Sequence, residues 1–111
     1  SMRLDSKVMI YLFTAGALVI SPLAAHAAGD ARAVFEANGC ASCHAPNTKT
    51  VGPALKAIAK RYKGKAVSAE LAARIRAGSE GRWGGMPHPA IENISQDDAL
   101  LVARWILQGA P

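Results

Sequence analysis

One short motif restricts this chain more than any other feature: Cys40, Cys43 and His44 form a C-x-x-C-H pattern. Two thiols at this spacing, followed at once by an imidazole, are the attachment pattern of c-type haem. The thiols can reach the two vinyl groups of one haem and form thioethers, and the His44 imidazole then lies under the iron as its fifth ligand. The motif therefore predicts one covalently attached haem c with its iron.

Two other uses of the cysteine pair were weighed against haem. A thioredoxin-type C-x-x-C site normally lies in a βαβ unit, whereas this chain is 50% hydrophobic and only 5% aromatic, a composition that favours helices over sheets. A zinc site needs four ligands. After residue 27 the only histidine besides His44 is His88, so zinc would require a His₂Cys₂ arrangement. Haem remains the preferred interpretation.

The first 27 residues have the layout of a secretory signal peptide. A charged start that includes Arg3 and Lys7 precedes a 13-residue apolar run over residues 8–20 and a small-residue stretch that ends at Ala27. The alternative is a retained membrane anchor, but a spanning helix needs about 20 apolar residues. We therefore expect cleavage after Ala27, with no stable membrane anchor left afterwards.

The expected division is thus 1–27, a cloning scar at Ser1 followed by the signal peptide, and 28–111, one domain exported to the periplasm. The domain has eleven Lys or Arg and seven Asp or Glu, a net charge of +4 compared with +5 for the whole chain. Domains of this size commonly need a disulfide, a metal or a cofactor to complete their core. A bound haem would meet that need.

Local signals predict four helices. The first runs from 30 to 38 with Asp30 as N-cap, the second is opened by Gly52 and Pro53 and ended by Gly64, the third is capped by Ser68 and ended by Gly78, and the last is capped by Ser95 and runs through Ile106. Gly39 stops the first helix, and we expect it to let another element approach the backbone closely.

The ordered motifs resemble the short bacterial class I cytochromes c. The resemblance covers residues 31–107 and is carried by the segments 38–45, 48–55, 75–84 and 95–105. It implies an all-α fold of about four helices wrapped around one covalently attached haem. It also implies that the protein is no enzyme but an exported one-electron carrier, with fully ligated iron, between larger redox proteins.

The resemblance further assigns roles to single residues. Phe35 and Trp105 would touch beside Gly39, where the first and last helices cross. The carbonyl of Pro53 would accept a hydrogen bond from the haem-ligating imidazole, and the indole N–H of Trp83 would bond a haem propionate. In the simpler alternatives, Pro53 only starts a helix, and Trp83 only packs against other side chains without binding the haem.

The sixth iron ligand has two candidates. The family usually supplies a methionine from the loop before the last helix, and Met86 lies in that loop. In the family pattern, however, the methionine stands between two prolines five positions after the tryptophan, and here that position is His88, between Pro87 and Pro89. We favour Met86 from the usual ligand of the class and keep His88 as the alternative from the spacing.

Basic residues cluster between positions 49 and 65, where no acid occurs: Lys49, Lys56, Lys60, Arg61, Lys63 and Lys65. On a helix, Lys56, Lys60 and Lys63 would share one face. Such a cluster can be a merely solvated face, or it can steer an acidic redox partner towards an exposed haem edge. Nucleic acid is a poor candidate partner, because the chain is expected to be exported and contains few aromatic residues.

Two other functions were kept as alternatives. The chain could be a haem-based ligand binder or a small peroxidase-like enzyme whose distal ligand is displaced, or it could be the electron-entry subunit of an oxidoreductase complex. Carbon monoxide binding separates the first of these from a carrier, and co-purification with a partner would indicate the second.

Overall fold

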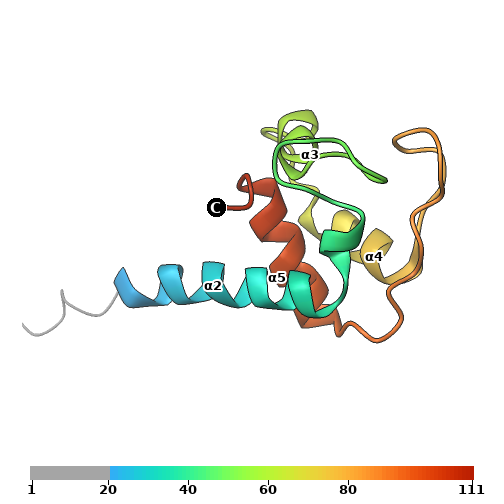
Figure 1. Cartoon of the computed structure of the whole chain (residues 1–111). Helices are drawn as coiled ribbons and strands as arrows, with labels where there is room; N and C mark the ends of the chain where they lie inside the picture. Colours follow the sequence, from blue (N-terminus) through green and yellow to red (C-terminus); the bar gives the residue numbers. More distant parts are fainter. Residues whose placement is uncertain (1–20) are drawn as a thin grey trace, which may run out of the picture.

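The computed structural model describes residues 21–111, and this part folds into helices joined by long loops (Figure 1). The elements are α2 (Ser21–Ala37), the 3-10 turn η1 (Cys40–Ser42), α3 (Leu55–Arg61), α4 (Ser68–Ala77) and α5 (Gln96–Leu107). The described residues form no β-strand beyond an isolated antiparallel bridge between Ser79 and His88. The predicted all-α fold of four helices is confirmed. Residues 1–20 of the predicted signal peptide (1–27) lie outside the described part, and residues 21–27 form the start of α2.

Among the described residues, no helix has the length and apolar character that crossing a membrane would require.

The first helix begins earlier than its sequence signals indicated. α2 starts at Ser21, so Asp30 lies inside the helix and the prediction that it is the N-cap was wrong. The stretch before Asp30 has alanine at positions 24, 25, 27 and 28, the residue with the highest helix propensity, and these alanines outweigh Gly29, a poor helix former that directly precedes Asp30. A favourable capping residue does not start a helix when the preceding residues are themselves good helix formers.

Gly39 lies just after α2, as predicted, but glycine is required there for a different reason than expected. Its φ of +74° lies in the left-handed region, and no atom lies within 4 Å of the position that a Cβ would occupy. The expectation of a close approach by another element was therefore wrong. Gly39 is needed because the backbone must turn sharply here into η1, in a conformation that other residues adopt at a cost.

α3 (Leu55–Arg61) is shorter than predicted, whereas α4 (Ser68–Ala77) begins one residue earlier than predicted. α3 ends at Arg61, so Lys63 lies beyond it and shares no helix face with Lys56 and Lys60. α4 has Val67 at its N-cap and Ser68 as its first residue, with no side-chain cap, so the predicted Ser68 cap was wrong. Gly78 ends α4 as expected, and its N–H donates to the carbonyl of Arg74 over 2.8 Å.

The last helix follows its signals closely. Ser95 is the N-cap of α5, and its hydroxyl accepts a hydrogen bond of 3.0 Å from the backbone N–H of Asp98. Asp97 and Asp98 lie in the first turn, where the helix dipole favours negative charge. α5 contacts α2, α3 and α4, so it is the central element of the fold.

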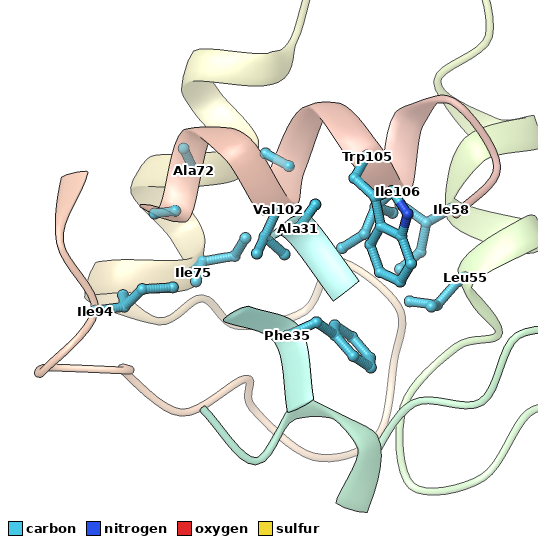
Figure 2. Close-up of a cluster of buried hydrophobic side chains, with 12 residues drawn as sticks. Ala31, Phe35, Leu55, Ile58, Ala72, Ile75, Ile94, Val102, Trp105 and Ile106 are labelled. Carbon is cyan, nitrogen blue, oxygen red and sulfur yellow. The ribbon is translucent and has the colours of Figure 1, made fainter. Parts of the chain in front are cut away.

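The core packs around α5 (Figure 2). Leu55 and Val102 are the largest fully buried side chains. The rings of Phe35 and Trp105 contact each other with their centroids 5.4 Å apart and their planes at 57°, which confirms the predicted crossing of the first and last helices. The indole N–H of Trp105 donates to the carbonyl of Pro111 over 3.1 Å, so the same side chain also holds the C-terminal residue.

Replacing Trp105 tests this packing. We expect Trp105→Ala to lower the free energy of unfolding by about 3–5 kcal/mol, because it removes a buried ring and leaves a cavity between α2 and α5. Trp105→Phe keeps most of the ring and loses the hydrogen bond, so its loss should be clearly smaller. Urea unfolding of the haem-loaded protein, followed by circular dichroism, measures both. A loss below about 1 kcal/mol for Trp105→Ala would contradict the assignment.

Candidate haem-binding site

The C-x-x-C-H motif is held in a tight turn directly after α2. The backbone N–H groups of Cys43 and His44 both donate to the carbonyl of Cys40, over 3.1 and 3.0 Å. The hydroxyl of Ser42 donates to the carbonyl of Gly39 over 2.7 Å, a further hydrogen bond that stabilises the turn. Cys40 and Cys43 are both half-buried and free, with no disulfide between them.

The environment of Cys40 does not suit dithiol redox chemistry. Burial raises the pKa of the Cys40 thiol, a hydrogen bond to its own backbone offsets part of the rise, and the charge of Cys43 adds to it. A redox-active or nucleophilic cysteine needs the opposite, a lowered pKa that favours the thiolate. The described residues also contain no group of three or more His, Cys, Asp or Glu side chains able to hold a metal ion.

The loop of residues 50–53 fixes the imidazole of His44. The Nδ1 of His44 lies 2.8 Å from the carbonyl oxygen of Pro53. Because a carbonyl can only accept, Nδ1 carries the proton and Nε2 keeps its lone pair. The N–H of Gly52 and the hydroxyl of Thr50 both donate to the carbonyl of Cys43, each over 2.7 Å. The loop is therefore folded directly onto the motif.

Gly52 makes this contact possible. A Cβ at position 52 would lie 2.7 Å from Cε1 of His44 and 3.1 Å from the carbonyl oxygen of Cys43, distances that real Cβ atoms essentially never or rarely show. The same loop is joined to α3, whose first N–H groups, those of Leu55 and Lys56, donate to the carbonyls of Ala45 and Pro46 over 3.0 and 3.1 Å. The motif and α3 thus form one connected unit.

The motif opens onto a cavity of about 660 Å³, within the range of about 300–1,000 Å³ typical of ligand sites. Its wall is formed by the motif, by α3 and α4, and by the loop between α4 and α5. All seven predicted site residues line this one cavity: Cys40, Cys43, His44, Pro53, Trp83, Met86 and His88. Much of the remaining wall is apolar, with Val51, Ala54, Ile58, Ile75, Pro87 and Ile91.

Three of the predicted site residues lie in the loop before α5, and they differ in their contacts and their exposure. The His88 ring faces the His44 ring, with the centroids 6.0 Å apart and the planes at 30°. Met86 is 74% exposed. Trp83 is 37% exposed, and the guanidinium of Arg61 lies over its ring, 4.5 Å from the centroid. Arg61 also donates to the carbonyl of Arg82, which ties this loop to the end of α3.

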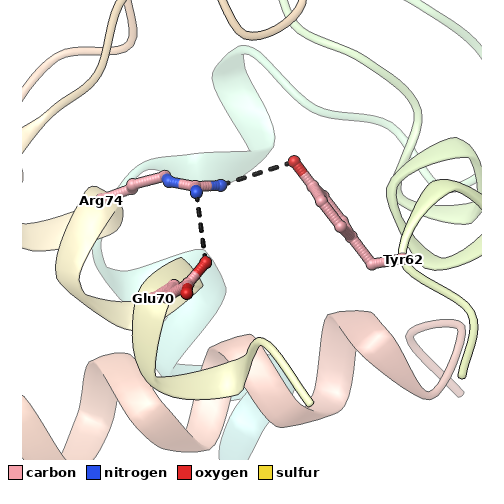
Figure 3. Close-up of polar contacts among 3 residues, drawn as sticks. All are labelled: Tyr62, Glu70 and Arg74. Atoms are coloured by element: carbon pink, nitrogen blue, oxygen red, sulfur yellow. Dashed lines mark hydrogen bonds and ion pairs between the residues drawn. The ribbon is translucent and has the colours of Figure 1, made fainter. Parts of the chain in front are cut away.

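Two residues of the cavity wall were missed by the sequence reasoning. Nη1 of Arg74 donates to the hydroxyl of Tyr62 over 3.4 Å, and Nη2 of Arg74 forms an ion pair of 3.4 Å with Glu70 (Figure 3). Both Arg74 and Tyr62 line the cavity. The i, i+4 spacing of Glu70 and Arg74 is readable in the sequence, but the contact with Tyr62 depends on how α4 packs against the end of α3.

These features fit a haem. Two half-buried thiols at the correct spacing, an imidazole with Nε2 unprotonated and an apolar cavity large enough for a ligand are brought together by a helical fold. A small all-α domain with this site defines a class I c-type cytochrome.

The chain belongs to the cytochrome c family, since the family model "Cytochrome c" matches residues 28–110. It is 46% identical over 81 residues to cytochrome c-551 of Pseudomonas aeruginosa, covering 72% of this chain and 77% of that protein. It is 45% identical over 96 residues to cytochrome c-552 of Nitrosomonas europaea, covering 86% and 89%.

Solved structures agree with this assignment. The crystal structure of wild-type Nitrosomonas europaea cytochrome c552 matches with a TM-score of 0.65 at 45% identity, covering 68% of this chain and 95% of that one. The class 1 cytochrome MtoD of Sideroxydans lithotrophicus matches with a TM-score of 0.65 at 26% identity, covering 75% and 96%. The protein therefore carries covalently attached haem c, and it is an electron carrier that acts with redox partner proteins and not an enzyme.

The contact between Gly52 and His44 can be tested by adding one methyl group. Gly52→Ala should push the imidazole away from the Pro53 carbonyl, shift the reduction potential of the haem-loaded protein, and lower its free energy of unfolding by about 1–3 kcal/mol. Gly29→Ala is the matched control, because nothing lies within 4 Å of its added Cβ. If both variants had the same potential and stability, the close approach would not matter.

Proposed function

We propose that the domain of residues 28–111 carries one electron at a time between redox proteins outside the cytosol, with side chains of this chain ligating its haem iron on both faces. When bound, the haem supplies a reversible one-electron couple at iron. The observation that carries the proposal is that the candidate ligands line one cavity and come from separate segments: His44 from the motif, and His88 and Met86 from the loop before α5. A ligand-binding haem protein needs one face open or weakly held.

Cys40 and Cys43 hold the haem in this proposal. Their thiols would hold it through two thioether bonds to its vinyl groups. His44 binds iron through Nε2, and Pro53 supports it by accepting the Nδ1 proton, which fixes the tautomer and ring direction. Covalent attachment suits a domain too small to enclose a large cofactor by packing alone.

Trp83 is proposed to donate its indole N–H to a haem propionate. Its ring lines the cavity, and an indole N–H is a hydrogen-bond donor. The guanidinium of Arg61 over the ring restricts its motion and adds positive charge at this edge. Arg74 lines the same cavity and is a second group able to face a carboxylate.

Carbon monoxide tests the carrier function against the ligand-binding alternative. The reduced protein should bind carbon monoxide slowly or not at all, because both axial positions are taken by the protein, and a redox titration should follow a single one-electron curve. Absorption spectra of the reduced protein before and after addition measure this. Rapid, complete binding would favour the haem-based binder instead.

Export is proposed from the layout of residues 1–27, and the family match supports it because it begins at residue 28, directly after the predicted cleavage site. The periplasmic location follows from that cleavage. Mass spectrometry of protein isolated from the periplasmic fraction should give a chain that starts at Ala28 and carries the mass of one haem. A full-length chain in the membrane fraction would contradict the proposal.

The docking face is proposed to comprise Lys49, Lys56, Lys60 and Lys63, all of which are exposed. Lys49 lines the haem cavity, Lys56 and Lys60 are one turn apart on α3, and Lys63 lies just beyond the helix end. No acid interrupts residues 49–65. Positive charge at the edge of the cavity attracts an anionic partner towards the place where an electron can leave.

Charge reversal on α3 tests the docking face with ferricyanide, a small anionic oxidant. The double variant Lys56→Glu and Lys60→Glu should slow oxidation of the reduced protein by about tenfold or more at low ionic strength, and the difference should shrink near 1 M salt, where the Debye length is about 3 Å. Stopped-flow absorbance measures the rate.

The control carries the same change of charge on two other helices, where Arg104 of α5 and Arg32 of α2 are exposed and do not line the cavity. The double variant Arg104→Glu and Arg32→Glu alters the net charge equally. If both double variants slowed the reaction to the same extent, net charge alone would be responsible and the docking face would be refuted.

A further inference from the structure

The two histidines of the cavity are arranged as a pair. Their ring centroids are 6.0 Å apart and their planes make an angle of 30°. When two imidazoles bind one metal ion from opposite sides, metal–nitrogen bonds of about 2 Å, together with about 1 Å from each nitrogen to its ring centre, place the centroids roughly 6 Å apart. The centroid spacing of His44 and His88 therefore matches the spacing of two imidazoles that share one ion.

Both imidazoles also have the tautomer that a metal ligand needs. Nδ1 of His88 lies 2.8 Å from the carbonyl oxygen of Pro89, just as Nδ1 of His44 lies 2.8 Å from that of Pro53. A carbonyl only accepts, so Nδ1 holds the proton in each ring and Nε2 keeps its lone pair. A carbonyl partner on the other ring nitrogen is the usual support of a metal-binding histidine.

The backbone of His88 is held in place as well. His88 and Ser79 exchange two hydrogen bonds, of 2.8 and 3.1 Å, which form the isolated bridge. Gly78 lies against the same segment, and a Cβ there would be 2.8 Å from the carbonyl oxygen of His88. This packing fixes the distal loop to the end of α4 at His88, where a ligand must be rigid.

Met86 lacks comparable support. Its side chain is 74% exposed, and within residues 21–111 its backbone groups make no hydrogen bond to other backbone groups. It follows Gly84 and Gly85, two consecutive residues with positive φ, so the chain turns sharply just before it. To reach the place that the His88 ring occupies, Met86 would have to bury its thioether and displace an imidazole that is already positioned.

We propose that His88, rather than Met86, supplies the sixth iron ligand, which gives the haem two imidazole ligands. The inference rests on the proposed function and specifies its distal ligand. His88 also occupies the position at which the resembled family has its methionine. Replacing a thioether by an imidazole lowers the potential of a haem, so this carrier would exchange electrons with partners of lower potential than a methionine-ligated relative could serve.

Spectroscopy of the haem-loaded protein tests the ligand directly. The oxidised wild-type protein should be low-spin and lack the long-wavelength charge-transfer band of methionine-ligated ferric haem. The reduced protein should show no strongly upfield-shifted methionine methyl signal in its proton NMR spectrum. Met86→Leu removes the rival sulfur ligand, and this variant should still be low-spin, with neither the charge-transfer band nor the upfield methyl signal.

Replacing His88 by methionine should change the absorption spectrum, the proton NMR spectrum and the reduction potential. His88→Met should acquire the charge-transfer band and the upfield methyl signal, and its reduction potential should rise. A wild-type protein that already shows both signals, and loses them in Met86→Leu, would overturn the proposal. Unchanged spectra in both His88→Met and a second variant, His88→Ala, would overturn it too.

The amount of haem attached to each sample shows whether a failed result concerns the proposed electron-carrier function or only the identity of the sixth ligand. One attached haem per wild-type chain, with reversible one-electron reduction, is required by the proposed function, whatever the sixth ligand. Absence of attached haem in wild type would overturn the function and the inference together. A fully loaded, reversible protein with Met86 on iron would overturn the inference alone.

Discussion

The 2.8 Å hydrogen bond between His44 Nδ1 and the Pro53 carbonyl is the contact on which the site depends. It orients the imidazole and joins the C-x-x-C-H turn to the segment that begins α3. Gly52 allows the two to approach, because a side chain there would collide with the His44 ring. An imidazole can carry its proton on either nitrogen, so this bond converts a side chain with two tautomers into a ligand of defined direction.

The rest of the fold separates a packed core from a cavity. α5 contacts the other three described α-helices, and Phe35 and Trp105 fill the crossing of α2 and α5. The cavity lies on the other side of α3 and α4, closed by the loop that carries His88. This small chain therefore fills one part of its interior with its own side chains and leaves the other part to a cofactor, because a domain of this size can bury only limited surface by itself.

Helix-capping rules correctly predicted those helix ends that depend only on residues close together in the sequence. Ser95 caps α5 because its hydroxyl and the next turn suffice for that bond. Asp30 is not the cap because the alanine-rich residues before it continue the helix. Lys63 does not share the helix face because α3 ends at Arg61, two residues before it. The contact between Arg74 and Tyr62, and the exposure of Met86, depend on how distant segments pack, so no pattern within one segment could reveal them.

The central claim is that the haem iron lies between the imidazoles of His44 and His88. X-ray absorption at the iron edge of the haem-loaded protein tests it most directly, since that measurement separates nitrogen from sulfur in the first shell of iron. The cysteine sulfurs bind the porphyrin side chains and not the iron, so they do not obscure the result. We predict a first shell of nitrogen alone, and a sulfur neighbour at bonding distance would contradict the claim.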